Sequence, residues 1–272
     1  MGYLPPGSRH NEAFRQSIPS SLDVREHFVT TSDKKRLHGF LVSKKQTQLL
    51  TGAEEPSKSA PVMIYFQGNA GNMSDRFGFF KTSIAAIPNL QIVGIAYRQY
   101  GNSEGFATEA GLKRDAKAIL EAVKDMYGPE APLYLYGHSL GGAVAIDLAA
   151  SEPNAIRGVI IENTFTSIYG MVCALYPKYS PYPFIAKYCL WNHWRSDLRI
   201  LKLLPTMRLL FLSSDQDEIV PSLHMKHLYA MARRAHIQSA TLVSFKRSLH
   251  MDIYSTETRL FQTSLRRFIK SE

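Results

Sequence analysis

The residues best suited to chemistry form the G-x-S-x-G pattern GHSLG at 137–141. An apolar run, LYLYG (133–137), precedes the serine, and the small-residue run LGGAVAIDLAA (140–150) follows it. This context predicts a sharp strand-to-helix turn in which two glycines permit a strained backbone and expose the hydroxyl of Ser139. We interpret Ser139 as a nucleophile rather than an incidental turn residue, and the adjacent His138 as a packing residue that the turn directs away from it.

A serine nucleophile needs a base to accept its proton, and after this kind of turn the base follows later in the chain. One candidate, His250, lies in the loop KRSLHMD (246–252) between the last predicted strand and the last predicted helix. A base in that loop can reach Ser139 across the strand ends, so we predict that His250 is the base. We interpret His224 and His227 as exposed helix residues, because no Asp, Glu or Cys completes a metal site around them. The other downstream histidines are His193 and His236.

The base must itself be oriented by an acid, and two candidates stand in LLFLSSDQDEIVP (209–221). Asp215 and Asp217 both directly follow an apolar run that predicts a strand. Taken alone, this spacing leaves the choice between the two aspartates open.

Hydrolysis by a serine also needs backbone N–H groups aimed at the developing oxyanion. One is expected at Leu140, the residue after the nucleophile, and the other at Asn69 in QGNAGN (67–72), which follows the predicted strand VMIYF. The alternative interpretation of QGNAGN is a simple turn. We further predict that Gly68, Tyr100 and Phe165 contact the substrate.

The elements that must position these residues alternate between strands and helices, which predicts a mostly parallel eight-stranded sheet flanked by helices. We predict an extended arm over residues 1–25 and one α/β domain over 26–272, with a polar loop at 43–61 and a small cap at about 166–204, after the sixth strand. The predicted strands are 27–31, 36–42, 62–66, 90–97, 133–137, 156–163, 208–214 and 240–245, and the predicted helices are 72–87, 108–127, 140–150, 223–235 and 256–269.

Composition excludes several other functions. The chain has 272 residues, of which 45% are hydrophobic and 20% charged, as in an ordinary globular domain. Its net charge of +9 comes from scattered Lys and Arg that do not interleave with aromatics, so we predict no nucleic-acid partner. No apolar run reaches the length of a membrane span, and the first residues, MGYLPPGSRH, have no apolar segment of the kind found in a signal peptide, so we expect neither in these residues. Cys173 and Cys189 are too few for a disulfide framework, so we expect reduced thiols in an intracellular protein.

The series QGNAGN, YRQYGNSEG, GHSLGG, IENTF, DEIVP and SLHMD resembles the α/β-hydrolases of the bud-emergence (BEM) type, relatives of the ABHD-type lipid and thioester hydrolases. The resemblance covers residues from about 25 to 270. It implies an α/β-hydrolase fold and a Ser-Asp-His serine hydrolase that acts on acyl lipids or acylated proteins, although some relatives are labelled peptidases. The family pattern G-x-x-D-x-x-V-P places the acid at Asp217. Asp215 then closes the turn by bonding to nearby N–H groups, and with Ser214 at the usual glycine position the turn is expected to need a strained or an adjusted backbone.

Three departures from the family pattern affect these expectations. Gln67 stands where the family has His before GNAGN, and we expect it to support the loop. Gln99 stands where the family has the glycine of Y-R-G-Y-G. Members usually begin with an apolar membrane anchor, which the first residues here do not resemble. This chain is therefore expected to be either a shortened sequence or a soluble variant, with membrane association still open to it.

Together these observations predict a monomeric serine hydrolase of carboxylic esters or thioesters that works without cofactor or metal. Its partner would be an acyl-ester or acyl-thioester substrate, with peripheral membrane contact. The apolar and aromatic residues of 164–205 are interpreted either as an acyl-binding lid or membrane-facing surface, or as ordinary cover for the core. The alternative functions are a serine peptidase-like hydrolase of the same fold and a non-catalytic scaffold at membranes.

Overall fold

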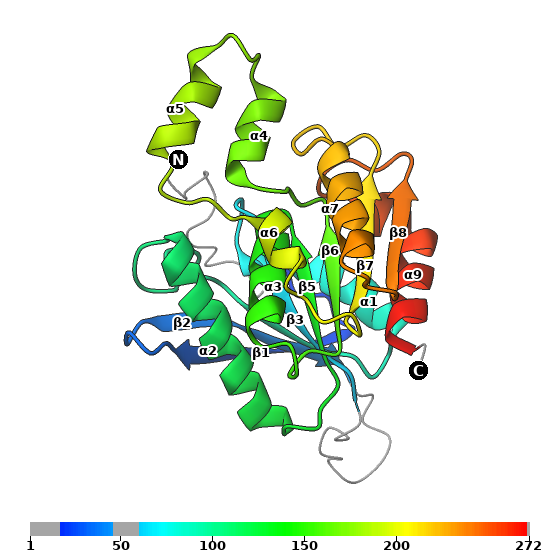
Figure 1. Ribbon diagram of the computed structural model, residues 1–272. Coiled ribbons are helices and arrows are strands. Elements are labelled where there is room, and N and C mark those ends of the chain that lie inside the picture. The colour runs from blue at the N-terminus through cyan, green and yellow to red at the C-terminus, as the bar shows by residue number, and fades with distance from the viewer. Residues whose placement is uncertain (1–16, 46–59, 271–272) are drawn as a thin grey trace, which may run out of the picture.

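The computed structural model describes residues 17–45 and 60–270, and its centre is one eight-stranded sheet in the order β1-β2-β4-β3-β5-β6-β7-β8 (Figure 1). The hairpin of β1 (Leu22–Thr30) and β2 (Arg36–Lys44) is antiparallel, and β2 also runs antiparallel to β4. The remaining strand pairs are parallel. This arrangement confirms the predicted fold class. The other strands are β3 (Val62–Phe66), β4 (Gln91–Ile95), β5 (Leu133–His138), β6 (Gly158–Glu162), β7 (Arg208–Ser214) and β8 (Ala240–Phe245).

Helices cover both faces of the sheet and bury a separate hydrophobic cluster on each (Figure 1). Every residue of β3, β5 and β6 is buried, because these central strands are enclosed from both sides. One face carries α2 (Glu109–Tyr127), α3 (Leu140–Ser151), α6 (Ser196–Ile200) and α7 (Leu223–Arg234). The other carries η2 (Met73–Arg76), α1 (Phe77–Ala86), α8 (Ile253–Thr256) and α9 (Thr258–Lys270).

The longest helix, α2, shows how the local sequence sets its bounds. Its N-cap residue Thr108 accepts a hydrogen bond from the Gly111 N–H, and its C-cap is Gly128 with φ 85°, a conformation that glycine adopts without strain. Leu112 and Val123 belong to the stripe at helical spacing that faces the core. The helix predicted at 108–127 therefore forms almost as expected.

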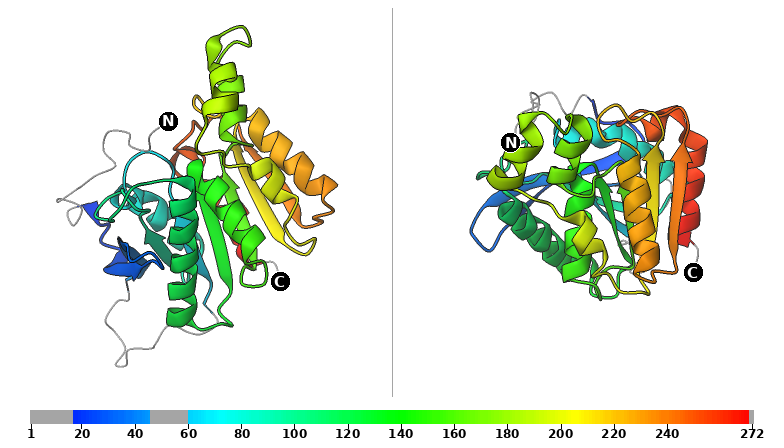
Figure 2. Two further views of the ribbon diagram at one scale, coloured as in Figure 1. Left: turned by 60° about the vertical axis from the view of Figure 1, so that its left-hand side comes forward. Right: turned by 45° about the horizontal axis from the view of Figure 1, so that its top comes forward.

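The cap consists of α4 (Ile168–Leu175) and α5 (Pro181–Cys189), which form a helical hairpin that projects beyond the body (Figures 1 and 2). Ser167 caps α4 by accepting from the Gly170 N–H, and Pro181 occupies the first turn of α5, where its missing N–H is not needed. The chain then returns to the body as α6, which packs on α3. The insertion after the sixth strand is thus a two-helix projection rather than a flat cover.

Several details differ from the predictions. Strand β1 begins at Leu22, so residues 22–25 of the predicted arm belong to the sheet, while 1–16 of that arm lie outside the described residues. Most of the predicted polar loop, 46–59, also lies outside them. His224 is buried rather than exposed, and its Nδ1 accepts from the Thr166 N–H at 3.3 Å. Within 17–45 and 60–270, no helix is both long and apolar enough to cross a membrane. Both cysteines are exposed and free.

Candidate active site

Ser139 occupies a strained turn between β5 and α3. Its φ of 53° and ψ of −117° are rare for a residue with a side chain, and such conformations usually cost about 1–3 kcal/mol. Two bonds to the end of β6 and the segment after it hold the turn: the Ser139 N–H donates to the Glu162 carbonyl at 2.9 Å, and the Thr164 hydroxyl donates to the Ser139 carbonyl at 2.6 Å. The backbone therefore keeps the serine at the carboxyl edge of the sheet, as its motif predicted.

The two glycines of the motif are required by close backbone contact. A Cβ on Gly137 would collide with the carbonyl of Gly141, and a Cβ on Gly141 would collide with the carbonyl of Phe66 in β3. These positions bring the Ser139 turn against the end of β3, where the QGNAGN loop begins.

His250 and Asp217 meet beside this turn, although 33 residues separate them in sequence. His250 Nδ1 lies 2.8 Å from Asp217 Oδ2, and the two side chains are only 4% and 1% exposed. Asp217 Oδ1 also accepts the backbone N–H groups of Ile219 and Val220, at 2.9 and 2.7 Å. These bonds fix the carboxylate, which leaves Oδ2 aimed at the imidazole.

Asp215 has a different partner. Its Oδ2 lies 2.6 Å from Lys246 Nζ, in an ion pair with an exposed lysine. The expected role of Asp215 as the acceptor that closes the turn was wrong, since the turn N–H groups bind Asp217 instead.

The backbone of His250 is anchored on both sides. Its N–H donates to Glu218 Oε2 at 2.9 Å, and its carbonyl oxygen lies 2.9 Å from His138 Nε2 and 3.0 Å from Asn163 Nδ2. Burial lowers the pKa of His138 well below its ordinary value, so the ring is neutral and Nε2 carries the proton that it donates. His138, interpreted from the sequence as a packing residue, therefore also positions the loop of His250.

A second support for this loop comes from Asn163 and Ser214. Asn163 Nδ2 donates to Ser214 Oγ at 2.9 Å, the Ser214 N–H donates to Asn163 Oδ1 at 2.8 Å, and Ser214 Oγ donates to the Leu249 carbonyl at 2.8 Å. Ser214 ends strand β7 and is not among the residues with positive φ, so of the two alternatives expected there the strained backbone was wrong. Asn163 instead adopts the left-handed conformation, with φ 44°.

The loop after β3 carries Asn69 and is held by buried side chains. The Tyr100 hydroxyl donates to Asn69 Oδ1 at 2.6 Å, and Arg76 Nη2 donates to the Ala70 carbonyl at 2.7 Å. Gln67 Nε2 donates to the Gly71 carbonyl at 3.3 Å, which agrees with its expected support of the loop. Tyr100, which was predicted to contact substrate, is 0% exposed in this structure, and its hydroxyl holds Asn69.

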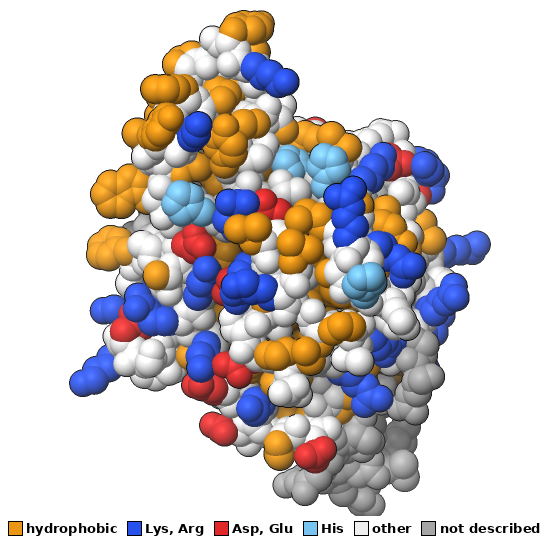
Figure 3. All heavy atoms as spheres, viewed as in Figure 1, with side chains coloured by type: hydrophobic (Ala, Val, Ile, Leu, Met, Phe, Trp, Pro, Cys, Tyr) orange, Lys and Arg blue, Asp and Glu red, His pale blue; other side chains and the backbone are white. Residues whose placement is uncertain are grey.

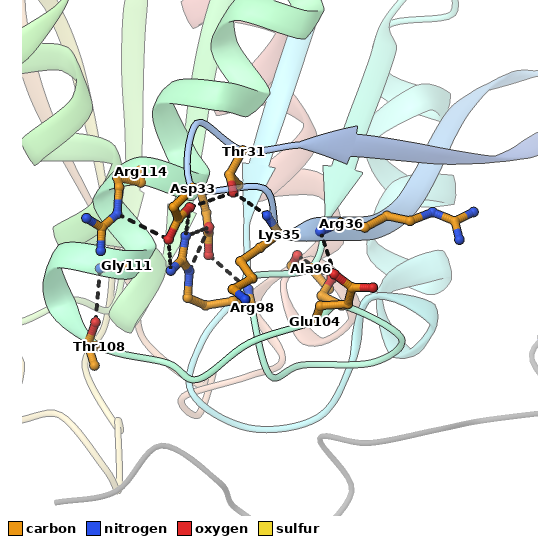
Figure 4. A network of polar contacts seen from close by, with 12 residues as sticks. Thr31, Asp33, Lys35, Arg36, Ala96, Arg98, Glu104, Thr108, Gly111 and Arg114 are labelled. Carbon is orange, nitrogen blue, oxygen red and sulfur yellow. Dashed lines mark hydrogen bonds and ion pairs between the residues drawn. The ribbon is translucent and has the colours of Figure 1, made fainter.

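An ion network anchors the segment that carries Tyr100 (Figure 4). The Arg98 guanidinium donates to Asp115 Oδ1 at 2.9 Å and to Asp33 Oδ2 at 2.8 Å, which links this loop to α2 and to the β1–β2 hairpin. The adjacent cation holds the pKa of the Asp33 carboxyl below its usual range. Gln99 has a φ of 75°, a backbone conformation that glycine adopts without strain, which accounts for the glycine that the family pattern Y-R-G-Y-G has at this position. The Gln99 Oε1 accepts the Ala107 N–H at 2.6 Å.

A cavity of about 270 Å³ opens at Ser139 and runs beneath the cap. Asn69 and Leu140, the two residues predicted to supply oxyanion-hole N–H groups, both line it, as does Phe165. Gly68 does not: a Cβ there would lie 2.9 Å from His138 Nδ1, so it packs behind the turn. No lining residue carries a charge, and most are apolar: Ile168, Met171, Val172, Leu175, Tyr176, Leu190, Trp191, Ile219 and Val220, besides Asn192.

Glu162 is a buried carboxyl behind this constellation that the sequence interpretation did not single out. It ends β6, beside the strand β5 that leads into Ser139, and the Tyr136 hydroxyl donates to its Oε2 at 2.6 Å. Burial raises the pKa of Glu162 to about 7, against the opposing hydrogen bond from Tyr136 and the charges of His250 and Arg76. The sequence feature that could have identified Glu162 is its position as an acidic residue at the end of the strand predicted at 156–163.

Comparisons with known proteins identify related hydrolase sequences. The family model described as "Serine aminopeptidase, S33" matches residues 98–192. The chain is 33% identical to protein bem46 of Schizosaccharomyces pombe, over 92% of this chain and 77% of that protein, and 31% identical to the alpha/beta hydrolase domain-containing protein WAV2 of Arabidopsis thaliana, over 86% and 74%. It is also 28% identical to the lysophosphatidylserine lipase ABHD12 of Danio rerio, over 69% of this chain and 51% of that protein.

Among solved structures, the fold is similar to that of the Pyrococcus furiosus esterase Pf2001. The TM-score is 0.74 at 15% identity, and the match covers 99% of this chain and 98% of the esterase. At this identity the likeness concerns the fold alone.

Proposed function

We propose, from the premise that this chain belongs to the α/β-hydrolase family of bem46 and WAV2, that it is a serine hydrolase of carboxylic esters or thioesters. One observation carries the proposal: the buried Asp217–His250 pair, 2.8 Å apart, lies beside the strained Ser139 turn. Ester hydrolysis by a serine needs this combination of nucleophile, base and orienting acid.

The proposed reaction has two stages. His250 Nε2 takes the proton of Ser139 Oγ as that oxygen attacks the acyl carbonyl carbon, and Asp217 keeps Nδ1 protonated and stabilises the imidazolium. The N–H groups of Leu140 and Asn69 stabilise the oxyanion. When the tetrahedral intermediate collapses, His250 gives its proton to the leaving alcohol or thiol, which leaves an acyl ester on Ser139. Water, activated by His250, then hydrolyses that ester and restores the enzyme.

The lining of the cavity supports an acyl group as the substrate. Apolar side chains from the cap surround the space beyond Ser139, and none of the described residues that line it has a charge to bind a charged substrate end. Its volume of about 270 Å³ is just below the range of about 300–1,000 Å³ that is typical of small-molecule pockets. An acyl chain would occupy this space, while the leaving group would extend outward.

A serine peptidase is the second candidate, because the matching family model is described as a serine aminopeptidase. An aminopeptidase must bind the positively charged amino end of its substrate, which ordinarily requires a carboxylate in the site. None of the lining residues has one, so we rank this function below ester hydrolysis. A non-catalytic scaffold, the third candidate, gives no reason to keep Asp217 and His250 buried and paired.

The substrate class can be tested with purified protein and three sets of substrates: p-nitrophenyl esters of increasing acyl length, acyl thioesters, and aminoacyl p-nitroanilides. We expect hydrolysis of esters or thioesters and a preference for medium over very short acyl chains, because the cavity is apolar. The Ser139→Ala variant is the control for background hydrolysis. Hydrolysis of the anilides alone would replace this proposal with the peptidase.

A further inference from the structure

The outer face of the α4–α5 hairpin exposes large apolar side chains that the cavity does not use. Eight of the nineteen exposed large hydrophobic residues in the described part of the chain lie between Tyr169 and Trp191, and six of these eight do not line the cavity. Tyr179 is 93% exposed, Phe184 69% and Tyr188 66%. Figure 3 shows these hydrophobic side chains gathered on the projection at the top of the molecule. Scattered surface hydrophobics need no explanation, but a contiguous cluster marks an interaction surface.

The charge on this segment has one sign. No Asp or Glu occurs between Glu162 and Asp197, whereas Lys178 and Lys187 both lie on the hairpin and are exposed. The whole chain carries a net charge of +9. A partner for this face must therefore be apolar at its centre and anionic at its rim.

An anionic lipid bilayer has this chemistry. Tyr and Trp favour the boundary between headgroups and acyl chains, and Lys can extend its ammonium to the headgroups while its stem lies along apolar surface. Each lysine near an anionic membrane contributes about 1 kcal/mol of attraction. A second copy of this chain fits less well, because its own hairpin would bring the same positive charges.

The hairpin is anchored to the body of the protein at its base. At its base, Glu109 Oε2 accepts the N–H groups of His193 and Trp194, at 2.6 and 3.0 Å, and the Trp194 side chain is buried. Away from the base, the aromatic contacts are local: the rings of Phe184 and Tyr188 lie 5.1 Å apart. The exposed tip can therefore enter a lipid surface without disturbing the core (Figure 2).

The same hairpin lines the cavity with its other side, through Met171, Val172 and Leu175. Trp191 joins the two surfaces, since it lines the cavity and is 92% exposed. We propose that the outer face of the α4–α5 hairpin docks on an anionic lipid bilayer, which places the cavity entrance at the membrane surface. Delivery of acyl chains from the bilayer to Ser139 follows if the proposed hydrolase function is correct, but the docking itself does not depend on it.

Docking is tested by co-sedimentation with vesicles, with Ser139→Ala as the starting protein so that no lipid is hydrolysed. The vesicles contain phosphatidylcholine alone or phosphatidylcholine mixed with phosphatidylserine. We expect binding to the mixed vesicles that weakens as salt rises. The double variants Tyr179→Ser/Phe184→Ser and Lys178→Glu/Lys187→Glu should each lower the partition coefficient by about 10-fold or more.

Two controls separate docking from general surface effects and from misfolding. Met126→Ser and Lys81→Glu change exposed residues of α2 and α1, outside the hairpin, and should leave vesicle binding unchanged. With Ser139 restored, both hairpin double variants should hydrolyse a water-soluble short ester at the wild-type rate, because none of their residues lines the cavity.

Several results would overturn the proposal. These are no binding to either vesicle, equal binding to neutral and anionic vesicles, or equal binding by the hairpin variants. A dimer in solution that the Tyr179→Ser/Phe184→Ser variant abolishes, without vesicle binding, would assign the face to a second copy. Vesicle binding by a protein that hydrolyses no ester would keep the docking surface and reject the proposed function.

Discussion

Asp217 Oδ2 lies 2.8 Å from His250 Nδ1, whereas Asp215, two residues earlier, pairs with Lys246 at 2.6 Å. The first pair is buried and next to the nucleophile turn, and the second includes a lysine that is 76% exposed. The two aspartates are the same residue type only two positions apart, but their different partners in the structure indicate different roles.

Replacing each aspartate by asparagine tests this division. Asp217→Asn should lower kcat for a p-nitrophenyl ester by about 10³–10⁴-fold, because an asparagine amide does not hold the imidazole in the required tautomer. Asp215→Asn removes an exposed ion pair, and such pairs contribute about 0–1 kcal/mol, so kcat should stay within about threefold. Steady-state kinetics of both variants decide the matter, and a larger loss at Asp215 would reverse the assignment.

The Tyr100 hydroxyl is predicted to act through Asn69. Tyr100→Phe removes the donor to Asn69 Oδ1, which loosens the loop that presents one oxyanion N–H. Loss of a whole oxyanion donor costs about 10²–10³ in kcat, so loosening one should cost about 10-fold, with KM little changed. Tyr134→Phe is the matched control, because its buried hydroxyl donates to the Ile269 carbonyl on the closing helix. Equal losses in the two variants would indicate a general stability effect.

The adjacent residues Ser213 and Ser214 differ in the hydrogen bonds that their hydroxyl groups make. Ser214 Oγ bonds with both Asn163 and the Leu249 carbonyl, whereas Ser213 Oγ is buried and has no hydrogen-bond partner among the described residues. Ser214→Ala should lower the free energy of unfolding by about 1–2 kcal/mol and reduce kcat several-fold, because the His250 loop loses a support. Ser213→Ala should change stability by less than about 0.5 kcal/mol. Urea denaturation of both variants measures the difference, and equal effects would contradict the network.

The raised pKa of Glu162 predicts that the free energy of unfolding depends on pH. Its pKa is raised to about 7 in the folded protein, while the ordinary value is 4.5, so between these pH values the unfolded chain binds fewer protons. This group therefore makes the protein less stable as pH rises from about 4.5 to 7. Relative to Glu162→Gln, the wild type should lose about 2–3 kcal/mol of unfolding free energy between about pH 5 and pH 8.

The measurement for Glu162 is urea denaturation of both proteins at the two pH values. Glu130→Gln is the control, because Glu130 is exposed and should show no such difference from wild type. A constant difference between wild type and Glu162→Gln across this range would mean that Glu162 is ionised throughout.

Sequence patterns predicted the sheet and the Ser139 turn because both depend on local features, namely continuous apolar strands and paired glycines. The position of His250 followed from chain order. The supports of His250 could not be predicted, because His138, Asn163 and Glu218 reach it from the end of β5 and from the segments after β6 and β7. These contacts depend on how the loops meet in space, which no spacing in the chain records.

Tyr100 shows what spacing in the chain leaves out. Substrate contact was predicted for it, whereas the structure buries its ring and directs its hydroxyl to Asn69. Likewise, the composition of 164–205 left a lid, a membrane face and core cover as alternatives. The hairpin combines an inner face that lines the cavity with an outer face that stays exposed, which only the fold reveals.

The central claim, that Ser139 is an activated nucleophile, is tested most directly with a fluorophosphonate probe. Such probes react with serines that a neighbouring base activates, so wild-type protein should be labelled and mass spectrometry should place the adduct on Ser139. His250→Ala should slow labelling strongly, and Ser139→Ala should abolish it. Wild-type protein that stays unlabelled, or Ser139→Ala protein that is labelled equally, would contradict the account.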